Sequence, residues 1–290
     1  MISSVIKKKK KVQNVLPNPK LPLMRLISSL FIGFIAFFIF GKSNKTDLEY
    51  LPIDKARYKV VYQMNFIEDT VKRKINDTYA TLLIGDSIVT YGDKHKIDSD
   101  SVSYTYRKQN NGKKLNPMQL LSTIMGVKFT HQIYLNYPRR DSLTVTASIV
   151  GSKCYTESRP VQNWTETGRS KTIFDLNCKE AVCSYRGRDY VAYYCPDIPL
   201  SYGPDVFGGL PGLIMELHDG KQEYAWNLVG FEPCNYGHEI TINMKDVQKL
   251  SREEFRAADL HYKQNPWLAF PDAPMARKFK PKPYNPVEKY

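Results

Sequence analysis

The sequence predicts a mainly β protein built on an antiparallel sheet. After the first 43 residues, apolar and polar positions alternate in short runs, and a period of two is typical of strands with one buried face. The chain contains 20 tyrosines, and aromatic and β-branched side chains fit a pleated surface. Only two segments carry clear helix signals, so we expect one or two short helices.

The strand prediction is clearest in the run "ARYKVVYQMNF", residues 56–66. Tyr58, Val60, Tyr62 and Met64 fall on one side of this run. The runs "YATLLI", "SIVTYG", "HQIYLNY" and "LTVTASIV" are shorter and are bounded by Gly, Asp, Asn or Pro. Closely spaced short strands with turn residues between them indicate an antiparallel sheet.

Two segments are typical of capped helices. "NPMQLLSTIMG" begins with Asn116, has proline at the first helical position and ends at Gly126. "SREEFRAADLHYKQNP" has Ser251 and Glu254 at capping-box spacing and ends before Pro266. The polar stretch at residues 98–114 is expected to be a mobile connection rather than a helix or a strand.

The first 43 residues are interpreted as a signal peptide or a membrane anchor. Fifteen uncharged residues, "LISSLFIGFIAFFIF", follow Arg25 and precede "GKSN". A basic flank and a short apolar run are typical of a secretory signal, whereas a membrane-spanning helix needs about 20 apolar residues. Met24 is an alternative start that would leave "MRLISSLFIGFIAFFIFGKS" as the whole signal. An uncleaved anchor with a basic cytoplasmic end remains open, and contact with the membrane is expected only through this segment.

The net charge of +13 does not indicate a nucleic-acid partner. Residues 1–43 hold eight lysines and arginines and no acidic residue, and the proline-rich tail, residues 271–290, carries a net charge of +3. Residues 44–270, interpreted as a single antiparallel β domain, therefore carry only about +2. A nucleic-acid binder is expected to hold its basic residues on the folded body. The tail is interpreted as an extended basic segment.

The segment "KEAVCSYRGRDYVAYYC" is typical of a hairpin that turns at Arg186, Gly187 and Arg188, where Gly187 supplies a positive φ. These two arginines form either an anion clamp or, as we favour, a solvated tip, because charged turns are normally exposed. Downstream, "PDIPLSYGP" is too rich in proline for an inner strand. Its last residues, Gly203 and Pro204, and the turn at residues 186–188 are the candidate ligand-binding loop residues.

A tight loop then leads into an apolar run that is predicted to be a buried strand. The hexapeptide here is Gly209-Leu210-Pro211-Gly212-Leu213-Ile214. With "YATLLIGDSIVTYGDKHKIDSDS" upstream and "LSREEF" and "YNPVE" downstream, the chain resembles the GLPGLI family. The resemblance covers nearly the whole chain after residue 43. It implies an exported protein of Gram-negative bacterial envelopes, in the periplasm or associated with the outer membrane, of unestablished function, in which the hexapeptide is structural.

The hairpin and its edge also resemble, more distantly, the curved half-barrels of periplasmic lipoprotein carriers. We therefore expect a curved sheet, either a half-barrel or an open barrel. Cys183 and Cys195 depart from the GLPGLI pattern, and because both flank the 186–189 turn with like parity we predict a cross-strand disulfide between them. An odd total of five cysteines leaves at least one thiol free or paired between chains.

No catalytic motif is recognised. The sequence has no G-x-S-x-G, no H-E-x-x-H and no P-loop, and we predict no catalytic residues and no cofactor. The leading interpretation is a non-enzymatic module that binds a hydrophobic or peptidic ligand, or a partner protein, of the envelope. Handling of copper or zinc, with His218 and His238 as weak candidates, and an envelope hydrolase with an unrecognised site remain open.

Overall fold

The computed structural model describes residues 50–234, 238–269 and 278–289, and it confirms a mainly β protein with one large curved sheet. The predictions for residues 1–43 lie outside the described residues. In the described part the strands are β1 (Tyr50–Ile67), β2 (Ile75–Gly85), β3 (Val89–Asp93), β4 (Gln132–Leu135), β5 (Ser142–Ser148), β6 (Ser152–Ser158), β7 (Thr165–Ile173), β8 (Leu176–Tyr185), β9 (Arg188–Cys195), β10 (Leu213–Asp219), β11 (Tyr224–Pro233), β12 (Glu239–Asn243) and β13 (Gln248–Lys249). The helices are α3 (Lys94–Gln109), α4 (Pro117–Ile124), α5 (Arg252–Gln264) and the short 3-10 helix η1 (Pro266–Ala269).

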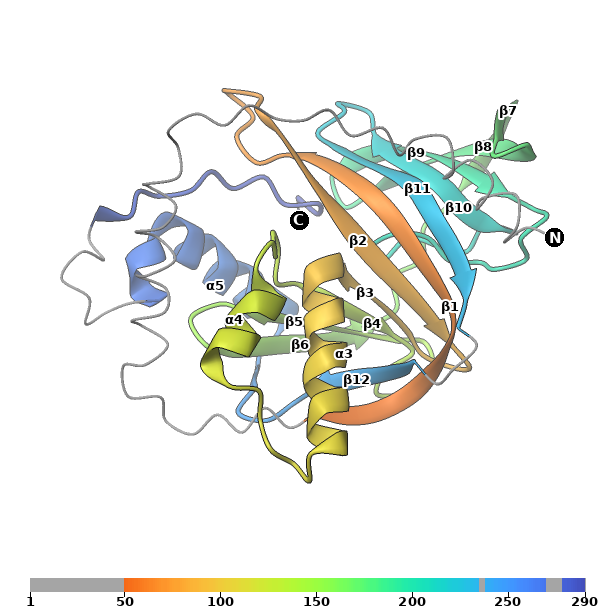
Figure 1. Ribbon diagram of the computed structural model, residues 1–290. Helices are drawn as coiled ribbons and strands as arrows, with labels where there is room; N and C mark the ends of the chain where they lie inside the picture. Colours follow the sequence, from red (N-terminus) through yellow and green to blue (C-terminus); the bar gives the residue numbers. More distant parts are fainter. Residues whose placement is uncertain (1–49, 235–237, 270–277, 290) are drawn as a thin grey trace, which may run out of the picture.

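The sheet follows the order β13-β6-β5-β4-β3-β2-β1-β11-β10-β9-β8-β7, and β12 pairs with the first half of β1. All of these pairs are antiparallel except β13 with β6. β1 lies at the middle of the path, so the two long β1 pairings, with β2 and β11, join the two halves of the sheet (Figure 1). No helix in the described part of the chain is long and apolar enough to cross a membrane.

The alternation seen in the sequence decides which face of β1 is buried. Val60 and Tyr62 are fully buried and Met64 is 6% exposed, whereas the residues between them are only half-buried. Their side chains join those of β2, β3, β10 and β11 in one core on the concave side of the sheet. The predicted strand and its inward-facing residues are therefore confirmed.

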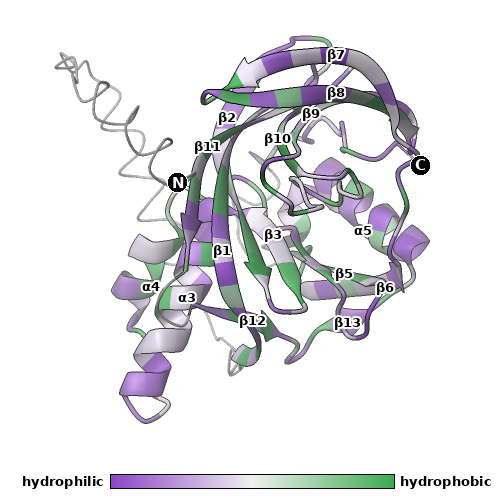
Figure 2. Cartoon of the chain, turned by 90° about the vertical axis from the view of Figure 1, so that its right-hand side faces the viewer, coloured by the Kyte–Doolittle hydropathy of each residue, from purple (hydrophilic) through white to green (hydrophobic). Residues whose placement is uncertain are grey.

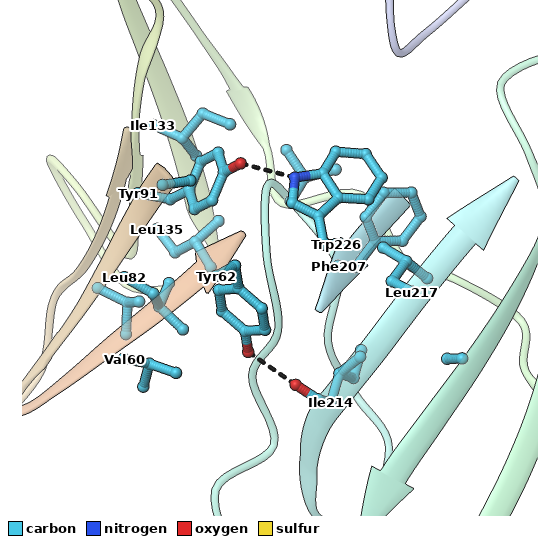
Figure 3. Close-up of a cluster of buried hydrophobic side chains, with 14 of the residues drawn as sticks. Val60, Tyr62, Leu82, Tyr91, Ile133, Leu135, Phe207, Ile214, Leu217 and Trp226 are labelled. Atoms are coloured by element: carbon cyan, nitrogen blue, oxygen red, sulfur yellow. Dashed lines mark hydrogen bonds between the residues drawn. The ribbon is translucent and has the colours of Figure 1, made fainter. Parts of the chain in front are cut away.

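Figure 3 shows how two hydrogen bonds tie the polar ends of these large side chains into the core. The Trp226 indole N–H donates to the Tyr91 hydroxyl at 2.8 Å. The Tyr62 hydroxyl donates to the carbonyl oxygen of Ile214 at 2.7 Å. A buried hydroxyl or indole N–H group without a hydrogen-bond partner would destabilise the fold by about 1–3 kcal/mol. These two bonds avoid that cost and also fix the positions of the aromatic rings.

Both predicted helices form where the capping residues indicate. Asn116 caps α4 and Ser251 caps α5, each with the reciprocal bonds of a capping box. α5 lies inside the curve of the sheet, as Figure 2 shows. Its residue Phe255 belongs to the concave core. It therefore faces the strands of both halves.

The prediction of a mobile connection over residues 98–114 is wrong, because most of this stretch belongs to α3. The Asp93 carboxylate accepts the N–H groups of His95 and Lys96 and so caps the helix. Pairs at i,i+4 spacing, such as Lys94 with Asp98, then support it. α3 packs on the opposite face of the sheet from α5, where Ile97 joins a second, smaller core with β12.

The hexapeptide ends in an interior strand. Leu213 and Ile214 are the first residues of β10, which pairs with β9 on one side and β11 on the other, and both side chains are fully buried. Gly212 lies directly against the backbone of Cys195, since a Cβ at this position would be 2.6 Å from the Cys195 carbonyl carbon. Only glycine permits this approach between the loop and the end of β9.

Candidate functional site

The loop between β9 and β10 turns into the concave side of the sheet and fills part of it. Phe207, near the middle of this loop, is fully buried. Its ring packs against those of Tyr185, Tyr190 and Trp226, with centroids 4.5–6.4 Å apart. These contacts hold the preceding residues of the loop, including Gly203 and Pro204, in fixed positions inside the molecule.

Next to this loop lies a cavity of about 530 Å³. Its walls come from both halves of the sheet, from α5 and from the C-terminal segment, residues 282–288. The inner walls are apolar and aromatic, and include Met64, Tyr91, Ile133, Val145, Tyr155 and Phe255. Charged side chains also line it, among them Lys128, Asp259 and Lys263. This size and this mixture are typical of small-molecule sites, which are largely apolar with a few polar groups.

Asp205 places a carboxyl group in the wall of this cavity. Its backbone is left-handed, with φ of 57°, and one carboxyl oxygen accepts the N–H of Val206 at 2.9 Å. Burial, followed by the negative charge of Glu288, raises the pKa of Asp205 to about 7. The group is therefore balanced between its neutral and its charged form near neutral pH.

A second titratable pair lines another part of the cavity. The His131 Nε2 atom lies 4.0 Å from the Asp259 carboxylate, and the imidazole ring packs edge-on against Phe255. Burial lowers the pKa of His131 below its ordinary value, although the Asp259 charge opposes this. His131 is therefore neutral at pH 7 and can donate or accept a hydrogen bond.

The hairpin turn forms as expected, with Tyr185 opposite Arg188 and positive φ at Arg186 and Gly187. The solvated tip that we favoured is wrong, because both arginines point inward. The Arg188 side chain is 2% exposed, and its Nη1 donates to Asp219 at 2.9 Å and to Glu223 at 2.6 Å. Burial by itself would lower the pKa of Arg188, but these two carboxylates raise it.

The same arginines bind the C-terminal segment of the chain. The second terminal nitrogen of Arg188 donates to the Asn285 side-chain oxygen at 2.6 Å and to the carbonyl of Pro286 at 2.8 Å. Arg186 donates to both oxygens of Glu288, at 2.8 and 2.7 Å, and its other nitrogen binds Glu157. Hydrogen bonds that involve charged groups are about twice as strong as neutral ones, so this contact fixes the segment.

Tyrosine hydroxyls bind the backbone of the segment. Tyr190 donates to the carbonyl of Val287 at 2.9 Å, and Tyr224 donates to the carbonyl of Asn285. The Asn285 amide in turn donates to the carbonyl of Ile67 at the end of β1. Residues 285–288 are thus held along one side of the cavity.

The cysteine prediction is corrected by the strand register. In the β8–β9 hairpin Cys183 lies opposite Tyr190, and Cys195 lies one position beyond Tyr194. Cys195 lies five residues beyond Tyr190, the partner of Cys183, so the two cysteines lie far apart along the hairpin. Residues that face each other across a two-residue turn also have one odd and one even number, so Cys183 and Cys195 lie on opposite faces. Cys195 instead lies beside Cys178, whose thiol it contacts; burial and this neighbour raise the pKa of Cys178 to about 12.

The structure does not bring the two candidate metal ligands together. His218 lies on β10, where its ring contacts Gln222, while the His238 backbone pairs with Ala56 beside β12. Among the described residues, no group of three or more His, Cys, Asp or Glu side chains is arranged to hold a metal ion.

Sequence reasoning missed three parts of the cavity: Asp205, the pair of His131 and Asp259, and Glu288. Asp205 lies between Gly203 and Gly208 in the loop between β9 and β10, and an aspartate in a loop does not by itself indicate a binding site. Glu288 belongs to the "YNPVE" segment, which was singled out as part of the family resemblance but was not assigned a position in the fold.

Comparison with known proteins gives one family and distant structural likenesses. The family described as "Protein of unknown function (Porph_ging)" matches residues 153–216. These residues run from β6 through the β8–β9 hairpin and the loop that follows it into β10. No curated protein is significantly similar to the chain in sequence. Two crystal forms of one protein, "Structure of PNGF-II in C2 space group" and "Structure of PNGF-II in P21 space group", are each similar at 12% identity and a TM-score of 0.46 over 70% of this chain. The chain spans about a third of their length, 32% and 33%.

Proposed function

We propose that this chain is an exported envelope protein of the GLPGLI family that binds a hydrophobic or peptidic ligand in the concave cavity. The observation that carries the proposal is the cavity of about 530 Å³ with apolar and aromatic inner walls. Ligand sites of small molecules occupy about 300–1,000 Å³, so the volume suits one small ligand or a few side chains of a peptide.

A peptidic ligand is favoured by the way the cavity already holds residues 285–288. Tyrosine hydroxyls and Arg188 bind three successive backbone carbonyls there, and two arginines, Arg186 and Arg252, bind the Glu288 carboxylate. Groups that bind backbone carbonyls can bind any extended peptide, whatever its side chains. The chain's own segment thus illustrates the type of ligand that this surface accepts.

Export is supported by the N-terminal sequence, with its basic flank and short apolar run. The family proposal rests on the ordered set of motifs around the hexapeptide, and the matching Porph_ging region contains that hexapeptide. Cell fractionation of a Gram-negative host with an antibody to residues 44–290 tests the location. Recovery of the full-length chain in the cytosol would contradict export.

Ligand binding is tested with the apolar fluorescent probe N-phenyl-1-naphthylamine. We expect saturable binding to the wild type and binding weakened at least tenfold in Val145→Phe, because Val145 lines the cavity and the added ring fills part of it. Val182→Phe is the matched control, since Val182 is a half-buried strand residue outside the cavity wall. Equal loss in both variants, or no saturable binding to the wild type, would refute the proposal.

A second function, an envelope hydrolase, is favoured by one observation. His131 with Asp259, and Asp205 with its pKa raised to about 7, place titratable groups in a partly enclosed cavity, as general acid–base catalysis requires. Incubation with libraries of ester, peptide and glycoside substrates tests it. Turnover that is lost in both Asp205→Asn and His131→Gln would support the hydrolase, and turnover unaffected by both would exclude this site.

A further inference from the structure

We infer that Asp205 anchors a positively charged amine of the ligand, so that the natural ligand combines an apolar body with a primary or secondary ammonium group. This inference rests on the proposed function and specifies the chemistry of the same cavity. A basic peptide, whose lysine side chain carries such a group, and an amphipathic amine both satisfy it.

The first reason is that the Asp205 carboxyl is largely unused by the protein. One of its oxygens accepts the N–H of Val206. A carboxylate offers about four acceptor positions, so most of its capacity is left for a ligand. No ion pair to Asp205 is formed by a lysine, arginine or histidine of the described residues, and the nearby Arg186 is committed to Glu157 and Glu288.

The second reason is that the side chains around Asp205 do not supply the missing donors. The charge of Asp205 acts on Tyr91, Tyr185, Tyr190 and Tyr224, which come from β3, β8, β9 and β11. Each of these hydroxyls donates elsewhere: to Met64 Sδ, to Glu288, and to the carbonyls of Val287 and Asn285.

The third reason is the charge balance of the surroundings. Besides the tyrosines, the charged groups that act on Asp205 are Glu288, which opposes its ionisation, and Arg186, which favours it. The guanidinium of Arg186 is matched by two carboxylates of its own. An added anion would therefore meet repulsion here, whereas an ammonium group would meet an unpaired carboxyl and the faces of aromatic rings, which also attract cations.

The loop is fixed well enough to serve as an anchor. Asp205 has a left-handed backbone, and the next two residues, Val206 and Phe207, are 2% and 0% exposed. The carboxyl therefore stays in the wall of the cavity without a ligand, and binding need not order it. Such preorganisation improves affinity because less conformational entropy is lost on binding.

The test compares two probes that share the same dansyl group and alkyl chain: dansylcadaverine, which ends in a charged primary amine, and its N-acetyl derivative, in which a neutral acetamide replaces the amine. Fluorescence titration gives the dissociation constant of each at pH 8. We expect the amine to bind at least tenfold more tightly than the acetylated probe, because only the ammonium group can form a charge-assisted hydrogen bond with the carboxylate. In Asp205→Asn this difference should disappear.

The pH dependence has a defined sign. Because the pKa of Asp205 is about 7, the ionised fraction rises from about a tenth at pH 6 to about nine-tenths at pH 8. The affinity for the amine should rise about tenfold over this range, and that for the acetylated probe should stay constant. Burial lowers the pKa of His131, which also lines the cavity, so this group loses its proton at a lower pH than a free imidazole does.

Asp141→Asn is the matched control. Asp141 is also an aspartate with a left-handed backbone, with φ of 60°, but its side chain is 81% exposed. Asparagine tolerates this conformation at both positions, so both variants should fold, which circular dichroism checks. If both probes bind equally well to the wild type, the inference fails and the proposed function stands. If neither probe binds, the proposed function fails and the inference with it.

Discussion

Substitution of Gly212 by alanine tests whether the hexapeptide is an architectural element. The added Cβ would overlap the Cys195 carbonyl oxygen and lie 2.6 Å from its carbon and 2.9 Å from Pro196 N. All three atoms belong to the backbone, so a side-chain rotation cannot relieve the overlap. The end of β9 or the start of β10 must move by roughly an ångström, because non-bonded carbon atoms approach to about 3.5 Å at their optimum.

The cost can be estimated from two effects. Overpacking of a filled core costs about 1–3 kcal/mol. The movement also weakens the bond from the Leu213 N–H to the Ile198 carbonyl, now 3.0 Å, and a buried donor left without its partner costs about 1–3 kcal/mol. We therefore expect Gly212→Ala to lower the free energy of unfolding by about 2–6 kcal/mol, a large part of the 5–15 kcal/mol typical of a domain.

Gly209→Ala is the comparison within the same hexapeptide. Gly209 has φ of 84°, but no neighbouring atom lies within 4 Å of the position that an added Cβ would take. Its replacement therefore costs only the left-handed backbone, about 1–2 kcal/mol. Urea denaturation followed by circular dichroism and by tryptophan fluorescence measures both variants. A Gly212→Ala variant that loses less stability than Gly209→Ala would refute the reasoning.

Three further predictions concern the buried groups. Arg188→Ala should lower the free energy of unfolding, measured in urea, by about 3–5 kcal/mol, because the buried carboxylates of Asp219 and Glu223 lose their cationic partner. A loss below about 1 kcal/mol would contradict this expectation. Folding raises the pKa of Asp205 from 3.8 to about 7, so the folded state binds the proton more tightly and the stability of the wild type should fall as the pH rises from 4 to 8. In Asp205→Asn, the decrease in the free energy of unfolding that comes from Asp205 should be absent when stability in urea is measured over the same pH range. If the variant lost as much stability between pH 4 and 8 as the wild type, this prediction would be wrong. Oxidative refolding should link Cys178 to Cys195, detected by non-reducing peptide mapping, and a link from Cys183 to Cys195 would be inconsistent with the register.

The strands and the two capped helices could be predicted because their signals are local. The alternation in β1 identifies Val60 and Tyr62 as core residues without any knowledge of their partners. Asn116 and Ser251 similarly mark helix starts through bonds that span three residues. Local signals of this kind are fully contained in a short window of sequence.

The helix α3 was missed because its stability does not come from an apolar stripe. Its sequence is polar on nearly every side, and only Ile97 among its large apolar residues is buried. The cap from Asp93 and the pairs at i,i+4 spacing supply the rest. A search for apolar periodicity therefore finds no helix there.

The hairpin arginines were misread because their partners are remote. Arg188 binds Asp219, 31 residues away, and Arg186 binds Glu288, 102 residues away. A charged turn is normally solvated, but here remote carboxylates of the sheet and the C-terminal segment bind its two arginines. The same distance in sequence hid the cavity, since Asp205, Val145 and Glu288 meet only in the folded chain.

Photolabelling most directly tests whether the concave cavity is the ligand site. An alkylamine that carries a benzophenone group is added to the protein, and the mixture is irradiated. The labelled residues are then located by mass spectrometry of the digested protein. We predict adducts on the cavity wall, chiefly at Met64 and Val145 and on the segment 283–288, and their suppression by excess dansylcadaverine. Labelling confined to exposed apolar residues outside the cavity, such as Val71 and Val161, would contradict the account.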